Sequence, residues 1–346
     1  MDQALPNTEL AAALRATRAK ARETQACRAA VMGVGVRQYR RYERDEAYIP
    51  ANRIASLYDH VCQHVIQRLP ANHRGRDFIV GDLHGYGPLL RQFLAEHDFC
   101  AETDRVFSVG DLIDRGPESL DTLRLLYEPW FYAVRGNHED MLLHYSAAQY
   151  RYGVPDTNHP FIGNGGDWVL HLEPDARDEL RYRLLPRMAL LPHLLVVGAG
   201  SQRYHVVHAE LDGPQERVTD AVLDAVGDAA SRDLLPFEYI EGFGGHDRWR
   251  MRLLWGRSLI QGCSPTVFTG NVAISTLAGL SPTFVGHTVV PQVLQQSSHI
   301  FLDTGAARMG YAGGGYLTVA EIPCADLKAL SWHRLGAEMA SLLRRR

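Results

Sequence analysis

Residues 77–85 read DFIVGDLHG, and this stretch sets the pattern for the middle of the chain. The apolar run from Phe78 to Val80 predicts a buried strand, and the polar residues Asp82 and His84 follow directly behind it. The same order returns at residues 106–116, VFSVGDLIDRG, and at residues 131–139, FYAVRGNHE. A helical pattern follows each cluster. Three strand–loop–helix units in series predict a parallel sheet with right-handed crossovers.

Polar clusters in this pattern fall at one edge of the predicted sheet, because parallel strands present their carboxyl ends together and bind ligands there. Asp82 and Asp111 are 29 residues apart and Asn137 follows 26 residues later, about one βαβ unit each. A predicted hairpin over 194–208 and a strand over 283–287 end in His208 and His287. Carboxylate, imidazole and carboxamide groups suit divalent cations, so we expect a metal site.

The motifs GDxHG, GDxxDRG and GNHE, followed by two separated histidines, resemble the phosphoprotein phosphatase family in its bacterial and phage branch, over about residues 77–320. The resemblance implies an α/β fold, the metallophosphoesterase four-layer sandwich of two mixed sheets flanked by helices. It also implies two divalent metal ions, expected to be Mn²⁺ with Fe or Zn as alternatives, and Asp111 as the bridge between them. The implied metal ligands are Asp82, His84, Asp111, Asn137, His208 and His287.

Catalytic roles carried over from the resemblance fall on four further residues. Arg115 and Arg257 would clamp the phosphate, and His138 would be the general acid, oriented by Asp114. The implied activity is a Ser/Thr protein phosphatase that works by in-line attack of a metal-bridging hydroxide on a phosphoprotein. Two alternatives stay open: a nucleotide polyphosphate hydrolase of the diadenosine tetraphosphate type, and a DNA-binding regulator whose phosphatase domain only senses metal or nucleotide.

The first part of the chain is basic. Residues 1–76 hold 13 Lys and Arg against 7 Asp and Glu, whereas the remainder holds 23 against 33. A helix after Thr24 and a second over 36–43, separated by a glycine turn, resemble a Cro-repressor-like helix-turn-helix domain. This resemblance implies a homodimer that binds DNA through Gln25, Arg37, Gln38, Arg40 and Arg41. The alternative is a small helical cap or protein-interaction arm with a solvated basic face.

The sequence therefore predicts four segments: a helical domain over 1–70, a linker over 71–76, a metallophosphoesterase domain over 77–325 and a C-terminal helix over 326–346. A hydrophobic content of 46% excludes extended disorder. Five cysteines without a CxxC pair favour a reducing compartment. With neither a signal-like start nor a long apolar run, we expect a cytoplasmic protein that does not bind membranes.

Overall fold

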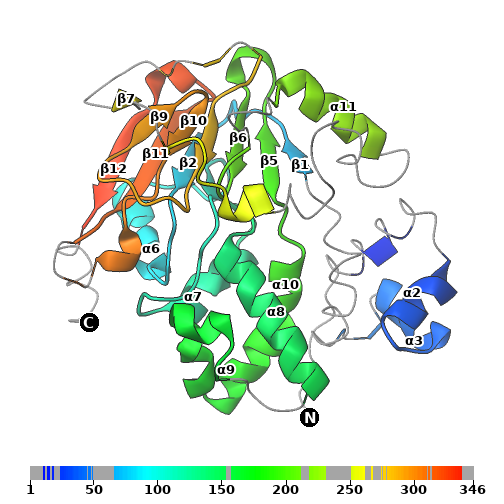
Figure 1. Cartoon of the computed structure of the whole chain (residues 1–346). Coiled ribbons are helices and arrows are strands. Elements are labelled where there is room, and N and C mark those ends of the chain that lie inside the picture. The colour runs from blue at the N-terminus through cyan, green and yellow to red at the C-terminus, as the bar shows by residue number, and fades with distance from the viewer. Residues whose placement is uncertain are drawn as a thin grey trace.

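The computed structural model describes residues 24–44, 66–152, 157–211, 218–230, 251–261, 279–309 and 314–336, with isolated residues between them (11, 14–15, 18, 46–47, 49, 266–267, 274, 276–277 and 311). Two mixed sheets form its centre (Figure 1). The first sheet runs β1-β5-β6-β8-β10-β9-β7 and the second runs β12-β11-β2-β3-β4. The expected α/β sandwich of two mixed sheets with flanking helices is confirmed.

The strands of the first sheet are β1 (Ile66–Leu69), β5 (Leu194–Val197), β6 (Tyr204–Val207), β7 (Thr266–Val267), β8 (Thr283–Val285), β9 (Leu294–Gln296) and β10 (His299–Phe301). Those of the second are β2 (Arg76–Val80), β3 (Arg105–Ser108), β4 (Phe131–Ala133), β11 (Leu317–Pro323) and β12 (Ser331–Leu335). The helices are α2 (Gln25–Val31), α3 (Val36–Glu43), α6 (Gly87–Glu96), α7 (Ser119–Leu123), α8 (Asn137–Tyr152), α9 (Pro174–Glu179), α10 (Leu185–Ala189) and α11 (Asp220–Ala230).

Alternating side chains divide the core into three layers. Ile79 and Phe107 of the second sheet pack with Phe284 and Ile300 of the first, which fills the space between the sheets. Phe78 and Val80 point the other way, into the layer that includes helices α6, α8 and α10. A third cluster covers the outer face of the first sheet and includes Leu223 of α11. Because side chains alternate between the two faces of a strand, each sheet packs on the other sheet through one face and on helices through its other face. The three hydrophobic clusters therefore lie between four layers, helix–sheet–sheet–helix.

Two predicted boundaries are wrong. Residues 66–69 were expected to be helical, but they form β1, which pairs in parallel with β5 of the first sheet. Residues 71–76 are not a free linker, because Asn72 accepts from the backbone N–H groups of Arg74 and Gly75 and donates to Asp77. In both places contacts with distant residues contribute, because Asn72 also donates to the Thr103 oxygen and the Gly75 oxygen accepts from the Cys324 N–H.

The predicted C-terminal helix is also wrong over its described part. Residues 331–335 form β12, antiparallel to β11, and Trp332 lies opposite Ala320. The apolar spacing of this segment fits a helix, but pairing with an otherwise open edge of β11 outweighs that preference. Residues 337–346 lie outside the described part of the chain.

Helices α2 and α3 form the pair expected near the N-terminus, at one side of the molecule (Figure 1). Thr24 caps α2 through a bond from the Cys27 N–H, whereas Gly35 at the start of α3 offers no side-chain cap. Within the described residues, no helix is both long and apolar enough to cross a bilayer.

Candidate metal centre

The polar residues behind the strands converge at one edge of the sandwich. Each follows a strand of one of the two sheets, so the two sheets contribute to a single centre. All six predicted ligands are at least 94% buried: Asp82, His84, Asp111, Asn137, His208 and His287.

Asp111 stands at the middle of this centre. The ligand atoms of His84, Asp111 and His138 all lie within 4.8 Å of one another, and so do those of Asp111, His208 and His287. The two groups share only the Asp111 carboxylate. A carboxylate has two oxygens and can serve two cations, so the geometry has the form that a bridging aspartate requires.

Backbone carbonyls set the tautomers of two histidines. His84 Nδ1 lies 2.8 Å from the Ile113 oxygen, and His208 Nδ1 lies 2.8 Å from the Val109 oxygen. A carbonyl only accepts, so each Nδ1 carries the proton and each Nε2 keeps a lone pair. Burial lowers the pKa of His84 to about 3, which keeps its ring neutral as a metal ligand must be.

Asn137 completes a donor set that fits a cation. Its Oδ1 lies 2.8 Å from His208 Nε2 and 3.0 Å from His287 Nδ1. In the tautomer that Val109 imposes, His208 Nε2 and Asn137 Oδ1 both present lone pairs to each other. A cation bound between them removes that repulsion, so the residues present fit a divalent metal.

Asp82 is turned toward His287. Both of its oxygens lie 3.1 Å from the His287 backbone N–H, and its carboxylate is outside the two groups of ligand atoms. Burial, with Asp303 and Asp111 nearby, raises its pKa well above the usual range. Its role as a ligand stays a prediction. Gly286 permits the close approach, because a Cβ there would lie 1.9 Å from Asp82 Oδ1.

Glu139 holds the loops together, a role that the sequence analysis missed. Its carboxylate accepts from the backbone N–H groups of Asp111, Leu112 and Gly136, at 2.8–2.9 Å. The side chain at the start of α8 therefore ties the loop after β3 to the loop after β4. Burial and the neighbouring Asp111 raise the Glu139 pKa to about 8. The sequence signals for it are its place as the last residue of the GNHE motif and in the first turn of a helix, and neither specifies its partners.

Backbone strain gathers at the same loops. Nine described residues other than glycine have positive φ, and five of them belong to the site: His84, Asp111, Asp114, Arg115 and His287. Each such residue costs about 1–3 kcal/mol and persists only where its surroundings hold it. The concentration of this strain marks the edge as a functional region.

His138 is oriented by a second buried carboxylate. Its Nδ1 lies 2.6 Å from Asp114 Oδ2, and its Nε2, which has no hydrogen-bond partner among the described residues, lies 3.9 Å from Asp111 Oδ2. Burial alone would lower the pKa of His138, but Asp111 and Asp114 outweigh it and raise the pKa. The ring is therefore held by a carboxylate at Nδ1 while Nε2 faces the centre, a position from which it could donate a proton.

Trp168 supplies the other partner of Asp114. Its indole Nε1 donates to Asp114 Oδ1 at 2.7 Å, so each oxygen of this buried carboxylate is engaged. Trp168 comes from the segment between α8 and α9 and also lines the adjacent pocket. Nothing in the sequence pattern around Trp168 indicated the bond to Asp114.

We expect Trp168→Phe to lower kcat about tenfold on an alkyl phosphate, because a lost hydrogen bond to a charged group is worth about 1.5–3 kcal/mol. Activity on nitrophenyl phosphate, whose leaving group needs little protonation, should fall less. Trp130→Phe is the matched control, since Trp130 packs on Phe99 and Phe131 away from the site. Equal losses on the two substrates would show that Trp168 does not act through His138.

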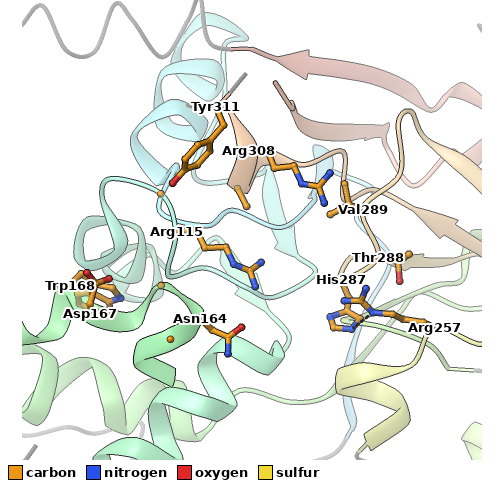
Figure 2. Close-up of a pocket in the computed structure, with 14 residues that line it drawn as sticks. Arg115, Asn164, Asp167, Trp168, Arg257, His287, Thr288, Val289, Arg308 and Tyr311 are labelled. Atoms are coloured by element: carbon orange, nitrogen blue, oxygen red, sulfur yellow. Dashed lines mark hydrogen bonds between the residues drawn. The ribbon is translucent and has the colours of Figure 1, made fainter. Parts of the chain in front are cut away.

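A cavity of about 740 Å³ opens beside the centre, lined by Arg115, Arg257 and His287 among others (Figure 2). Arg115 donates to His84 Nε2 at 3.2 Å, and Arg257 donates to His287 Nε2 at 3.1 Å. Both predicted arginines thus lie next to the candidate ligands and face the pocket. Their guanidinium groups are placed to bind a phosphoryl group there.

The residues predicted to contact DNA lie on α2 and α3. Arg37, Arg40 and Arg41 are exposed and Gln38 is half-buried. Gln25 is engaged internally, since it donates to Glu43 at 2.7 Å and accepts from Arg40 at 2.9 Å. DNA contact stays a prediction for these five residues.

Comparison with known proteins decides the family. Residues 78–247 match the model of the calcineurin-like phosphoesterase family. Serine/threonine-protein phosphatase 2 of Escherichia coli K12 is 30% identical over 244 residues, which cover 70% of this chain and 94% of that protein. The chain belongs to the calcineurin-like phosphoesterase family. It is therefore a hydrolase of this family, with buried His and Asp side chains that could hold a metal ion.

Other relatives of this calcineurin-like phosphoesterase carry two kinds of name. Serine/threonine-protein phosphatase 1 of Salmonella typhimurium is 38% identical over 150 residues, 43% of this chain and 65% of that protein. A symmetrical bis(5'-nucleosyl)-tetraphosphatase of Vibrio cholerae is 42% identical over 69 residues, 19% of this chain and 26% of that protein. A solved serine/threonine phosphatase from Saccharomyces cerevisiae superposes with a TM-score of 0.44 at 15% identity, covering 84% of this chain and 91% of that one.

Proposed function

We propose that this phosphoesterase is a protein phosphatase that removes phosphate from phosphoserine or phosphothreonine with two divalent cations, Mn²⁺ foremost. The observation that carries the proposal is the Asp114–His138 pair at 2.6 Å, which faces a centre built around one shared carboxylate, Asp111. The relative named serine/threonine-protein phosphatase 2 supports this choice, because the similarity extends over 94% of its length.

Each group then has a defined task. The bound cations would supply a nucleophile from water at neutral pH and neutralise phosphoryl oxygens. They would be held by the six buried ligands. Arg115 and Arg257 bind the oxygens of the phosphoryl group and position it in the pocket. His138 gives the proton on Nε2 to the leaving alkoxide, and Asp114 keeps the ring in place.

Substrate preference tests the proposal. The Mn²⁺-loaded full chain should release inorganic phosphate from a phosphoserine peptide faster than it cleaves diadenosine tetraphosphate, and a chelator should abolish both activities. The nucleotide polyphosphate alternative rests on the 42% identity to the Vibrio cholerae tetraphosphatase over 69 residues. Faster cleavage of diadenosine tetraphosphate than of the phosphopeptide would favour this alternative over the protein phosphatase.

A second candidate function is DNA binding by α3, as in a regulator whose phosphatase domain senses metal or nucleotide. It is favoured by the exposed face of Arg37, Arg40, Arg41 and Arg44 opposite the buried Tyr39. Duplex DNA binding should weaken with salt and fall in an Arg37→Gln, Arg41→Gln double variant. Unchanged DNA affinity in that variant would show that α3 does not bind DNA through these arginines. It would favour the alternative in which the helix pair is a protein-interaction arm or a cap.

A further inference from the structure

The pocket contains a third arginine that the reaction itself does not use. Arg308 lies among the lining residues together with Arg115, Arg257 and a single carboxylate, that of Asp167 (Figure 2). A phosphate monoester has one dianionic group, and two arginines and the metal centre already face it. The third guanidinium therefore has no counter-charge in such a substrate.

Arg308 is held in place by its local structure. Gly305 adopts a left-handed conformation (φ 87°), and the Arg308 N–H donates to the Gly305 oxygen at 2.8 Å in a tight turn over residues 306–308. Thr304 and Tyr316 close the base of this segment, because the Tyr316 N–H donates to the Thr304 oxygen and Thr304 Oγ1 donates to the Tyr316 oxygen. Buried Met309 anchors the turn on its far side.

Arg308 forms no ion pair within the described part of the protein. Its side chain is exposed and makes no ion pair or hydrogen bond with another described residue. By contrast, Arg115 and Arg257 each contact a candidate metal ligand. The charges of Arg115 and Arg308 both act to lower the pKa of buried Asp303, but the carboxylate of Asp303 accepts its hydrogen bond from the Gly305 N–H. Within the described residues, Arg308 thus presents to the cavity a guanidinium that no carboxylate binds by a hydrogen bond or ion pair.

Three large hydrophobic side chains lie exposed at or beside the pocket. Val289 and Tyr311 line it with exposed fractions of 38% and 70%. Trp255, which is 39% exposed, packs on His287 next to Arg257. A small phosphometabolite would leave these side chains in water, whereas a segment of polypeptide can cover them.

We propose that Arg308 forms a second anion subsite, beside the phosphoryl pocket, that binds an acidic side chain of the phosphopeptide next to the phosphorylated residue. This rests on the proposed protein phosphatase function. The same guanidinium could hold a neighbouring phosphate of a nucleotide, so the test includes both sources of the second anion. The subsite makes Arg308 a specificity residue, one that binds substrate without taking part in the proton transfer.

The test compares Arg308→Gln, Arg308→Lys and the wild-type full chain on four substrates. These are a phosphoserine peptide with flanking glutamates, the same peptide with glutamines, nitrophenyl phosphate and diadenosine tetraphosphate. Arg181→Gln is the matched control, because it removes an exposed arginine that stacks on Tyr182 outside the pocket. In Arg308→Gln we expect kcat/KM on the acidic peptide to fall about tenfold, mainly through KM, as for loss of a charge-assisted hydrogen bond.

The remaining substrates decide the interpretation. The glutamine peptide and nitrophenyl phosphate should change less than about twofold, and Arg308→Lys should recover part of the loss. Equal losses on all substrates, or none on the acidic peptide, would overturn the subsite. A loss confined to diadenosine tetraphosphate would overturn its assignment to a peptide. Wild-type protein that hydrolyses nitrophenyl phosphate but neither peptide would instead refute the protein phosphatase function.

Discussion

Asp111→Asn should abolish metal loading and lower kcat/KM by about 10³-fold or more, because both groups of ligand atoms depend on this one carboxylate. Burial alone would raise the pKa of Asp111, but the imidazoles of His208, His138 and His84 outweigh it and lower the pKa, so the residue is anionic where a cation would bind. An amide in its place offers one neutral oxygen. Metal content after dialysis against Mn²⁺, measured by mass spectrometry, is the direct readout.

The control for this variant is Asp175→Asn, the same change at an exposed position on α9. Circular dichroism and thermal unfolding of the metal-free proteins establish that Asp111→Asn still folds. A folded Asp111→Asn protein that keeps its full metal content and its activity would exclude the bridging role.

His138→Asn should retain its metal but lose about 10²–10⁴-fold in kcat on alkyl phosphates, the range that general acid catalysis contributes. Nitrophenyl phosphate should lose far less, since its leaving group is stable without a proton. The metal measurement is essential here, because His138 Nε2 also lies within reach of His84 and Asp111.

The two readouts separate two roles for the same ring. Loss of metal from His138→Asn would make His138 a ligand and remove it as the acid. Retained metal with equal losses on both substrates would point to a binding role. Only retained metal with a loss that depends on the leaving group agrees with the Asp114–His138 pair as the proton donor.

The order of strands and polar clusters could be predicted because it is local. Each apolar run of three or four residues is followed directly by its polar residues, so the strand end and the site are specified together at 78–84, 106–111 and 131–138. The hairpin β5–β6 and the strands that precede His208 and His287 were predicted on the same grounds and are confirmed.

Features that depend on distant parts of the chain could not be predicted. β1 and β12 form because β5 and β11 offer open edges, and the residue patterns of 66–69 and 331–335 contain no information about those edges. The same limit applies inside the site. Glu139 reaches Asp111 and Leu112, 28 and 27 residues away, and Trp168 reaches Asp114, 54 residues away, and neither residue type specifies those partners.

Strand β1 has a practical consequence for anyone who shortens this protein to study the hydrolase alone. A chain cut at Asp77 would lose β1 and leave one backbone edge of β5 (Leu194–Val197, four buried apolar residues) unpaired, although the other edge still pairs with β6. An exposed strand edge of this kind pairs with strands of other molecules, and the shortened protein is then expected to aggregate. Truncations should therefore begin upstream of Ile66, and poor solubility of shorter versions says nothing about the chemistry.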